Sequence, residues 1–206
     1  MLVLFVPAFS FSQSFGGGLL AGATISQVDG NGYRGYHQLG WTAGAFANWP
    51  VINDNLSLQM ELKYSLFGSH SDIKEESWGM NHYNLRLHYA EVPLMLRYNL
   101  KQFTIAGKSL DFISLEAGVS LDFLVKYRDE SSYSHNDNAP WRFFSATANA
   151  GIHFDIAERW GFGFRTMNSF IPIRMKGNTS GFFVGHYYNI ALQAVLIYNI
   201  RASHRY

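Results

Sequence analysis

The sequence contains no cysteine, few charged residues and almost no excess of charge of either sign, and each shortage excludes a class of protein. Without cysteine, the chain can form neither a disulfide framework nor a thiolate metal site. Charged residues make up 15% of the 206 residues, well below the roughly 25% that is typical of soluble domains. The net charge is only +1, so the composition offers no electrostatic case for nucleic acid as a partner.

Long apolar runs are also missing, because none approaches the roughly 18 residues of a transmembrane helix. A short apolar run, MLVLFVPAFSFSQS, opens the sequence and ends in small residues, with Ser10 and Ser12 at the positions expected before a signal-peptidase cut. The basic leader is absent, since no Lys or Arg precedes Arg34. We predict a truncated signal peptide at 1–12, whose true start lies upstream, and one domain at 13–206. The alternative is a buried first strand.

Apolar and polar residues alternate regularly in many segments of the sequence. In the stretch LSLQMELKYSLFG, every second residue from Leu56 to Leu66 is large and apolar, with Ser, Gln, Glu and Lys between them. A period of two predicts a strand with one apolar and one polar face. The same pattern predicts eight strands, at about 15–26, 39–49, 56–67, 83–99, 112–127, 143–156, 160–171 and 187–200.

The connections between these strands alternate in length. Those at 50–55 and 157–160 are short, and the one at 100–110 is somewhat longer. Between them fall polar linkers at 27–38, 69–82, 128–141 and 172–186. An even number of strands with alternating short and long connections is typical of outer-membrane barrels, whose periplasmic turns are short and extracellular loops long. The pattern predicts an all-β fold, an eight-stranded antiparallel up-and-down transmembrane β-barrel.

The volume of the side chains on each face decides which face meets lipid. An eight-stranded barrel has an interior just wide enough to be filled by side chains. The apolar face carries Leu, Met, Trp, Tyr and Phe, which would not fit inside, whereas the polar face is mainly Gly, Ser, Thr, Asn and Gln. We therefore predict that Leu58, Met60 and Leu62 face lipid, and that Glu61 and Lys63 face the lumen.

Aromatic residues, 17% of the chain, lie near many of the predicted strand ends. Amphipathic rings at both membrane interfaces would explain this placement, although aromatic residues are also common in strands generally. The candidate interfacial residues are Trp41, Trp49, Tyr64, Tyr83, Tyr127, Phe144, Trp160, Tyr188 and Tyr198.

The fourth predicted strand, YNLRLHYAEVPLMLRYN, breaks the alternation. Its large residues are odd-numbered up to Tyr89 and even-numbered from Val92 onward. Inserting one residue as a β-bulge restores the register, and proline is tolerated at bulges and edges. We predict a bulge at Ala90, close to Pro93.

This strand and the preceding one together resemble the PorT-like outer-membrane β-barrel family of Bacteroidota. Two glycines of the first strand, Gly18 and Gly22, and the eight-strand layout also fit. The resemblance implies an outer-membrane location, and some members of that family are tied to secretion machinery. The matching residues are Gln59, Glu61, Leu62, Tyr64, Gly68, Tyr89, Glu91, Pro93, Leu94 and Tyr98.

Charges of both signs fall on the predicted inner face. In a narrow lumen of low dielectric they must pair and hydrogen-bond to offset their desolvation. We expect a structural charge network that plugs the barrel; the alternative is a narrow ion or proton channel. The predicted network contains Glu61, Lys63, Glu91, Arg97, Glu116, Asp122, Lys126, His153, Asp155 and Arg165.

Histidines near the predicted outer rim raise the possibility of an outer-leaflet lipid-modifying or proteolytic enzyme. No spacing fixes a nucleophile, a base and an orienting group, or a metal site, and FGGGLLAG opens a strand rather than a phosphate-binding helix. We expect no enzyme and no cofactor or metal. The candidate catalytic residues are His70, His82, His88, His135 and His186, with Ser69, Ser71, Asp72 and Ser134; the candidate metal ligands are His70, Asp72, His82 and His135.

The patterns together predict an integral protein of the bacterial outer membrane, in contact with membrane lipid. A scaffold, a surface-binding protein or an accessory subunit of a secretion or transport complex would meet its protein partners through the four long loops. We expect a monomeric barrel.

Overall fold

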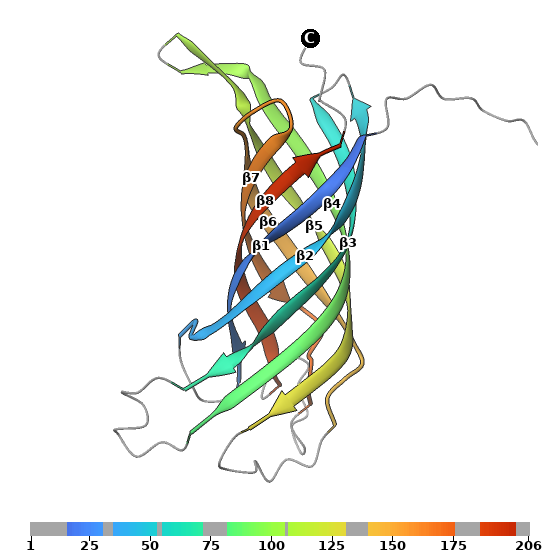
Figure 1. Cartoon of the computed structure of the whole chain (residues 1–206), viewed down its shortest axis with the longest axis vertical. Coiled ribbons are helices and arrows are strands. Elements are labelled where there is room, and N and C mark those ends of the chain that lie inside the picture. Colours follow the sequence, from blue (N-terminus) through green and yellow to red (C-terminus); the bar gives the residue numbers. More distant parts are fainter. Residues whose placement is uncertain are drawn as a thin grey trace, which may run out of the picture.

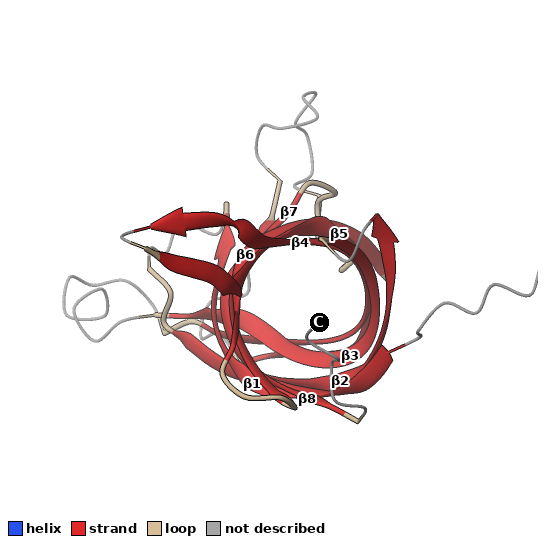
Figure 2. Cartoon of the chain, turned by 90° about the horizontal axis from the view of Figure 1, so that it is seen from above, coloured by secondary structure: helices blue, strands red, loops and turns tan. Residues whose placement is uncertain are grey.

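The chain forms a closed barrel in which eight antiparallel strands pair in chain order and β1 also pairs with β8 (Figure 1). The computed structural model describes residues 16–30, 35–52, 55–71, 82–105, 107–130, 140–175 and 186–200. The strands are β1 (Gly16–Asp29), β2 (Gln38–Ile52), β3 (Leu56–His70), β4 (Asn84–Ile105), β5 (Lys108–Asp129), β6 (Phe144–Asp155), β7 (Trp160–Ser169) and β8 (Tyr188–Asn199). The predicted fold class is confirmed, and a view along the barrel shows the closed ring (Figure 2). Within the described residues, no helix is long and apolar enough to cross a membrane.

Strand β3 shows how the alternating sequence produces the two surfaces of the wall. Met60 and Leu62 are 47% and 65% exposed on the outside, whereas Glu61 and Lys63 are buried inside. Successive side chains of a strand point to opposite faces, so closure of the sheet separates the two sets. The predicted facing of these four residues is confirmed.

The two ends of the barrel differ in their connections. β2–β3, β4–β5 and β6–β7 are joined at the end where β1 begins and β8 ends (Figure 1). The β6–β7 turn is closed by Trp160, whose carbonyl accepts a hydrogen bond from the Ile156 amide at 2.9 Å. Short turns lie on the periplasmic side of such barrels, so this is the periplasmic end. The long connections leave the opposite, extracellular end. Much of them, like the predicted signal peptide at 1–12, lies outside the described residues.

The connection predicted at 100–110 is instead the tip of a hairpin. β4 continues to Ile105, and β5 begins at Lys108. Thr104 pairs with Ser109, and Gly107 has a φ of +75°, a conformation that glycine adopts without steric cost. The prediction failed because the polar residues here were read as a loop, whereas they alternate with apolar ones in strand fashion.

The bulge predicted at Ala90 and Pro93 is wrong. Ala90 pairs with Phe123 and Pro93 with Ser120 in one uninterrupted register. The pairing of β3 with β4 keeps a single register as well. Odd-numbered residues therefore face inward along β4 on both sides of Ala90, the apolar ones included. The prediction assumed that apolar residues always face lipid, and in this strand they do not.

The β4–β5 pair has three register shifts, two of them in the hairpin between Asn99 and Thr104, and the one nearest to Ala90 lies at the extracellular end. His88 pairs with Lys126 but Tyr89 pairs with Leu124, which leaves Val125 as an extra residue on β5. One extra residue reverses which side chains face inward beyond it. Lys126 is consequently exposed, and its predicted place in the lumen network is wrong.

Candidate functional site

The interior of the barrel is the candidate site, and Arg165 lies at its centre. From β7, its Nη1 atom lies 2.8 Å from Oε1 of Glu61 on β3, and its Nε donates to Oε2 of Glu116 on β5 at 2.8 Å. β3 and β7 have three strands between them on either side, so the Arg165–Glu61 ion pair crosses the lumen. Arg97 from β4 binds the other oxygen of Glu116 at 2.6 Å. The four side chains join four strands across the axis.

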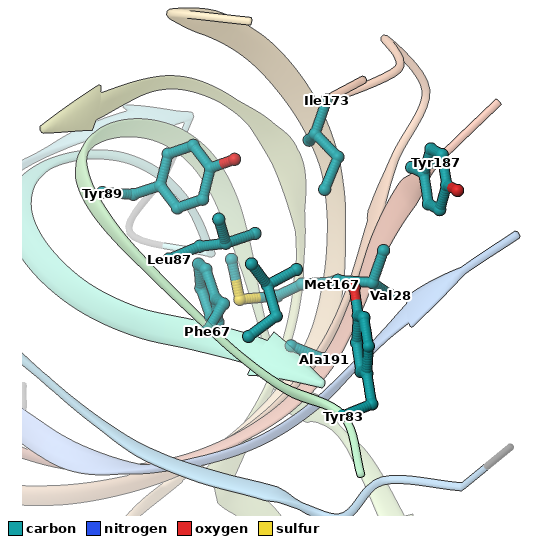
Figure 3. Packing of buried hydrophobic residues seen from close by; sticks show 10 residues of the cluster. Val28, Phe67, Tyr83, Leu87, Tyr89, Met167, Ile173, Tyr187 and Ala191 are labelled. Atoms are coloured by element: carbon teal, nitrogen blue, oxygen red, sulfur yellow. The ribbon is translucent and has the colours of Figure 1, made fainter. Parts of the chain in front are cut away.

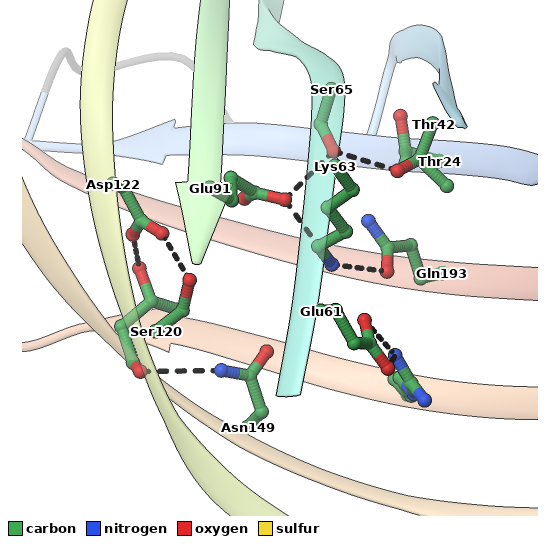
Figure 4. A network of polar contacts seen from close by, with 12 residues as sticks. Thr24, Thr42, Glu61, Lys63, Ser65, Glu91, Ser120, Asp122, Asn149 and Gln193 are labelled. Carbon is green, nitrogen blue, oxygen red and sulfur yellow. Dashed lines mark hydrogen bonds and ion pairs between the residues drawn. The ribbon is translucent and has the colours of Figure 1, made fainter. Parts of the chain in front are cut away.

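A second ion pair lies beside this group and is anchored on three strands (Figure 4). Lys63 Nζ lies 3.1 Å from Oε2 of Glu91 and donates to Oε1 of Gln193 at 3.0 Å. Ser65 Oγ donates to the same oxygen of Glu91 at 2.8 Å. These hydrogen bonds satisfy charges that burial would otherwise penalise. Below we call these two groups the ionic layer: Glu61, Lys63, Glu91, Arg97, Glu116, Arg165 and Gln193.

Two glycines make room for the buried cations of this layer. Gly44 pairs with Lys63, and a Cβ at Gly44 would lie 2.6 Å from the Cα and Cβ of that lysine. Gly151 pairs with Arg165, and a Cβ there would lie 2.9 Å from the arginine Cγ. Directly paired residues share one face of a sheet, so a glycine opposite each long side chain gives it space in the narrow lumen.

Asp122 is held by hydroxyl groups. Ser120 Oγ donates to Oδ1 of Asp122 at 2.5 Å, and Thr147 Oγ1 donates to Oδ2. All three residues are buried, on the same inner face of β5 and β6. A carboxylate with two close donors is better satisfied in the interior than one without them.

His153 and Asp155 extend the polar interior towards the periplasmic end. His153 is fully buried, and its Nε2 lies 3.1 Å from Oδ1 of Asp155, whose side chain is about one third exposed. Its Nδ1 lies 3.9 Å from Glu116. A Cβ at Gly161 would come within 2.4 Å of the His153 ring, so this glycine creates the space that the imidazole occupies.

An apolar cluster fills the extracellular part of the lumen, and the sequence analysis missed it (Figure 3). Leu85, Leu87 and Tyr89 enter it from β4 and are each at most 1% exposed. The interrupted alternation of β4 could have revealed this cluster. Its apolar residues before Ala90 are odd-numbered, as is Glu91, so they face the lumen as Glu91 does. Tyr83, predicted at the membrane interface, is buried here. We call this cluster the apolar layer: Val28, Phe67, Tyr83, Leu85, Leu87, Tyr89, Met167, Ile173, Tyr187 and Ala191.

A small cap of three residues packs at the extracellular edge of the apolar layer. Isolated β-bridges join Trp141 to Arg174 and Arg174 to Tyr187. The Arg174 guanidinium lies 4.9 Å from the centroid of Trp141 and 5.7 Å from that of Tyr187. Cation–π contacts and the buried Ile173 beside them hold this segment over the lumen.

The predicted lumen residues therefore fall into three groups. Asp155 lies at the rim, half-buried, and Lys126 lies outside. The other predicted residues lie in the interior: Glu61, Lys63, Glu91, Arg97, Glu116, Asp122, His153 and Arg165. Sequence reasoning missed the neutral partners Gln59, Ser65, Ser120, Thr147 and Gln193. Each contacts a buried charged residue, and of these contacts only that between Gln193 and Lys63 joins strands that are not neighbours in the sheet.

The described candidate catalytic and metal-binding residues make separate contacts of ordinary kinds. The rings of His70 and His82 lie 5.6 Å apart, and His88 Nδ1 lies 3.0 Å from the hydroxyl of Tyr64. Ser71 Oγ accepts a hydrogen bond from the Tyr83 amide, Ser69 is buried, and so is His186. His135, Asp72 and Ser134 lie outside the described residues, and the described part of the chain contains no group of three or more metal-ligating residues.

Comparison with known proteins finds a matching family model and similar solved structures. The family model described as outer membrane protein beta-barrel domain matches residues 11–174. The attachment invasion locus protein Ail of Yersinia pestis, solved with the heparin analogue sucrose octasulfate, is similar at 9% identity and a TM-score of 0.46, over 90% of this chain and 99% of Ail. Neisserial surface protein A is similar at 10% identity and a TM-score of 0.47, over 89% of this chain and 96% of its own. No curated protein sequence matches the chain.

The family match covers most of the chain, and the fold explains it: a closed barrel with an apolar outer wall and a polar interior is suited to a bilayer. The chain belongs to the outer membrane protein β-barrel domain family and is an integral protein of the bacterial outer membrane.

Proposed function

We propose that this protein is a non-conducting scaffold of the outer membrane, whose filled barrel holds its extracellular loops in position for a partner. The observation that carries this proposal is the ion pair between Arg165 and Glu61, which links opposite walls across the lumen. Because eight strands enclose only enough room for side chains, residues that meet at the axis fill the path that an ion would need.

The apolar layer supports the same function. Phe67, Leu87 and Met167 converge from β3, β4 and β7 in the extracellular part of the lumen (Figure 3). A hydrated ion crossing this layer would lose its water shell without gaining polar partners, which is costly. Two successive barriers of different chemistry favour a plug over a narrow ion or proton channel.

An accessory role in secretion or transport follows from the resemblance to PorT-like barrels. The partner surfaces in this proposal are the extracellular loops at 27–38, 69–82, 128–141 and 172–186. A rigid, filled barrel suits such a role because it fixes the spacing of the loop ends. The protein acts by binding rather than by catalysis, and it works as a single barrel in contact with lipid.

Planar-bilayer recording tests the closed lumen. Purified protein should insert without steady conductance, while an open trimeric porin, handled identically, conducts. Large, reproducible openings of the wild-type protein would overturn the plug and favour the channel.

Affinity capture of the native protein from detergent-solubilised outer membranes tests the accessory role. A stable envelope complex, lost when loop 128–141 is replaced by a short Gly-Ser turn in a correctly folded barrel, is the expected result. Capture of the barrel alone at native expression would contradict the accessory role and leave the plug to be judged by its conductance.

A further inference from the structure

Four basic side chains gather where β4 and β5 lie side by side at the extracellular end of the barrel, the lower end in Figure 1. Arg86 pairs directly with Arg128, and His88 pairs directly with Lys126. Directly paired residues carry their side chains on one face of the sheet, with Cβ atoms about 5 Å apart. Arg86, Lys126 and Arg128 are exposed, and His88 is half-buried. We call these four residues the basic patch.

The basic patch lies on the outer face of the wall. Alternation along β4 places its even-numbered residues outside, as it does for Leu94 and Leu96, which are 43% and 47% exposed on the lipid-facing surface. Arg86 and His88 have the same parity, whereas Leu87 between them is buried in the apolar layer. The patch therefore continues the surface that lipid surrounds.

The extra residue in β5 turns two of the four cations outward. Before it, even-numbered residues of β5 such as Asp122 face the lumen. Val125 is inserted into the pairing, and beyond it Lys126 and Arg128 pair with the outward-facing residues of β4. A bulge re-aims the side chains that follow it. Here the bulge assembles one basic surface from two strands.

The positive charge of the basic patch is only partly balanced by the described residues. Among them, one carboxylate pairs with the patch: Oε1 of Glu130 lies 2.6 Å from Nη2 of Arg128. Asp129 pairs with the inward-facing Leu85, so alternation directs its side chain to the opposite face. Like charges directly opposite each other destabilise a sheet. An anion from outside the chain would relieve this repulsion.

The basic patch lies at the level of the extracellular headgroups. Aromatic rings mark the membrane interface of such barrels. The rings of Trp41 and Tyr64 lie 5.6 Å apart, and the Tyr64 hydroxyl lies 3.0 Å from Nδ1 of His88. From His88 to Tyr98 near the periplasmic end, β4 is about 33 Å long at about 3.3 Å per residue. At a strand tilt of about 40° this is about 25 Å along the barrel axis, the height of the apolar band.

We propose that the basic patch binds the phosphate groups of an outer-leaflet glycolipid. Arginine binds phosphate through paired N–H donors, and lysine binds it as a point charge. Basic side chains beside a membrane bind anionic headgroups in the same way. A lipid fits better than a free anion, because its acyl chains would cover Leu94 and Leu96 below the patch. The proposal does not depend on the filled lumen or on a protein partner.

Native mass spectrometry of the folded protein in detergent micelles tests the proposal. The probes are lipid A with its phosphates, the same lipid A without them, and inorganic phosphate. Arg86→Gln with Lys126→Gln removes one arginine and one lysine from the basic patch. Lys101→Gln with Arg159→Gln removes the same charges from exposed positions at the periplasmic end and is the matched control. The heat-dependent gel shift shows that each variant is folded.

We expect the wild-type protein to bind phosphorylated lipid A about tenfold more tightly than the dephosphorylated form, and the Arg86 and Lys126 double variant to lose about tenfold in affinity. The control should stay within about twofold of the wild type, because its charges lie several Debye lengths away. Equal affinity of the wild type for the two forms of lipid A, or equal affinities of the two double variants, would overturn the proposal. So would equally tight binding of inorganic phosphate, which would assign the patch to a free anion.

Glu130→Gln tests the basic patch with an effect of opposite sign. Removing the carboxylate releases Arg128 for phosphate, so the affinity for phosphorylated lipid A should rise by about twofold, as expected for a surface ion pair. Loss of the fold would weaken binding and cannot produce this result. Unchanged or weaker binding by the folded variant would overturn the assignment of Arg128 to the patch.

Discussion

The ionic layer and the apolar layer fill the same barrel by opposite means. In the ionic layer, Arg165 must meet Glu61 and Glu116 in a fixed geometry, because an unpaired buried charge is severely destabilising. In the apolar layer, Leu87 and Met167 need only volume and close packing. The comparison shows that a membrane barrel can place an apolar core inside as well as an apolar surface outside, because the two lie on opposite faces of the wall.

The largest effect is expected from breaking the ionic layer at its centre. Arg165→Met should reduce the free energy of unfolding by about 3–5 kcal/mol, because Glu61 and Glu116 each lose a buried cationic partner. Urea unfolding in phospholipid vesicles measures this. Arg128→Met removes an exposed arginine paired with Glu130 and should change stability by less than about 1 kcal/mol. If the two variants lost the same free energy of unfolding, Arg165 would not be the centre of the ionic layer.

Breaking the apolar layer should cost slightly less. Leu87→Ala creates a cavity and should reduce the free energy of unfolding by about 2–5 kcal/mol. The matched control is Leu62→Ala on the lipid-facing wall, where the shortened side chain leaves space that lipid can fill. If Leu62→Ala proved the more damaging of the two, the inward facing of Leu87 would be wrong.

The outer wall gives a third comparison, between adjacent residues of β3. Met60→Arg places a charge in lipid and should cost roughly 2–4 kcal/mol near the bilayer midplane. Glu61→Gln stays in the lumen, so the barrel should still insert while its bond to Arg165 weakens. The yield of folded protein in vesicles, read by the gel shift, distinguishes them. Normal insertion of Met60→Arg would mean that inside and outside are exchanged.

The smallest effect is expected from removing one neutral hydrogen-bond donor from the polar interior. Ser120→Ala removes a donor from Asp122 and should cost about 1.5–3 kcal/mol, the range for hydrogen bonds to charged groups. Ser57→Ala, on the same strand face as Gln59 but nearer the periplasmic end, provides a matched serine deletion. An identical response of the two variants to urea would indicate that Ser120 does not support Asp122.

Sequence alone predicted the barrel, because a period of two and alternating connection lengths are local properties of the chain. It also predicted the facing of Glu61 and Lys63, whose neighbours alternate without interruption. It could not predict that Arg165 pairs with Glu61, because the partners meet only when the sheet closes. The pairing of Lys63 with Gln193 depends on the same closure.

Strand β4 shows where the reasoning failed. The bulge predicted at Ala90 would have put the large residues before it, Leu85, Leu87 and Tyr89, on the same face as those after it, and the structure contains no such bulge. The position of Lys126 failed for a related reason, since one extra residue at Val125 reverses the facing of the strand beyond it. If strict alternation had been extended along β4 from the inward-facing Glu91, these odd-numbered residues would have been placed correctly in the lumen.

The closed lumen is tested most directly by the access of water to the buried interior of the barrel. In the cysteine-free chain, Ser120→Cys lies in the buried interior and Ser109→Cys on the exposed hairpin. A small charged thiol reagent is added to the folded protein in vesicles, and the labelled fraction is followed by mass spectrometry. The account predicts complete labelling at position 109 and none at 120 until urea unfolds the barrel. Labelling at 120 as fast as at 109 would contradict the closed lumen.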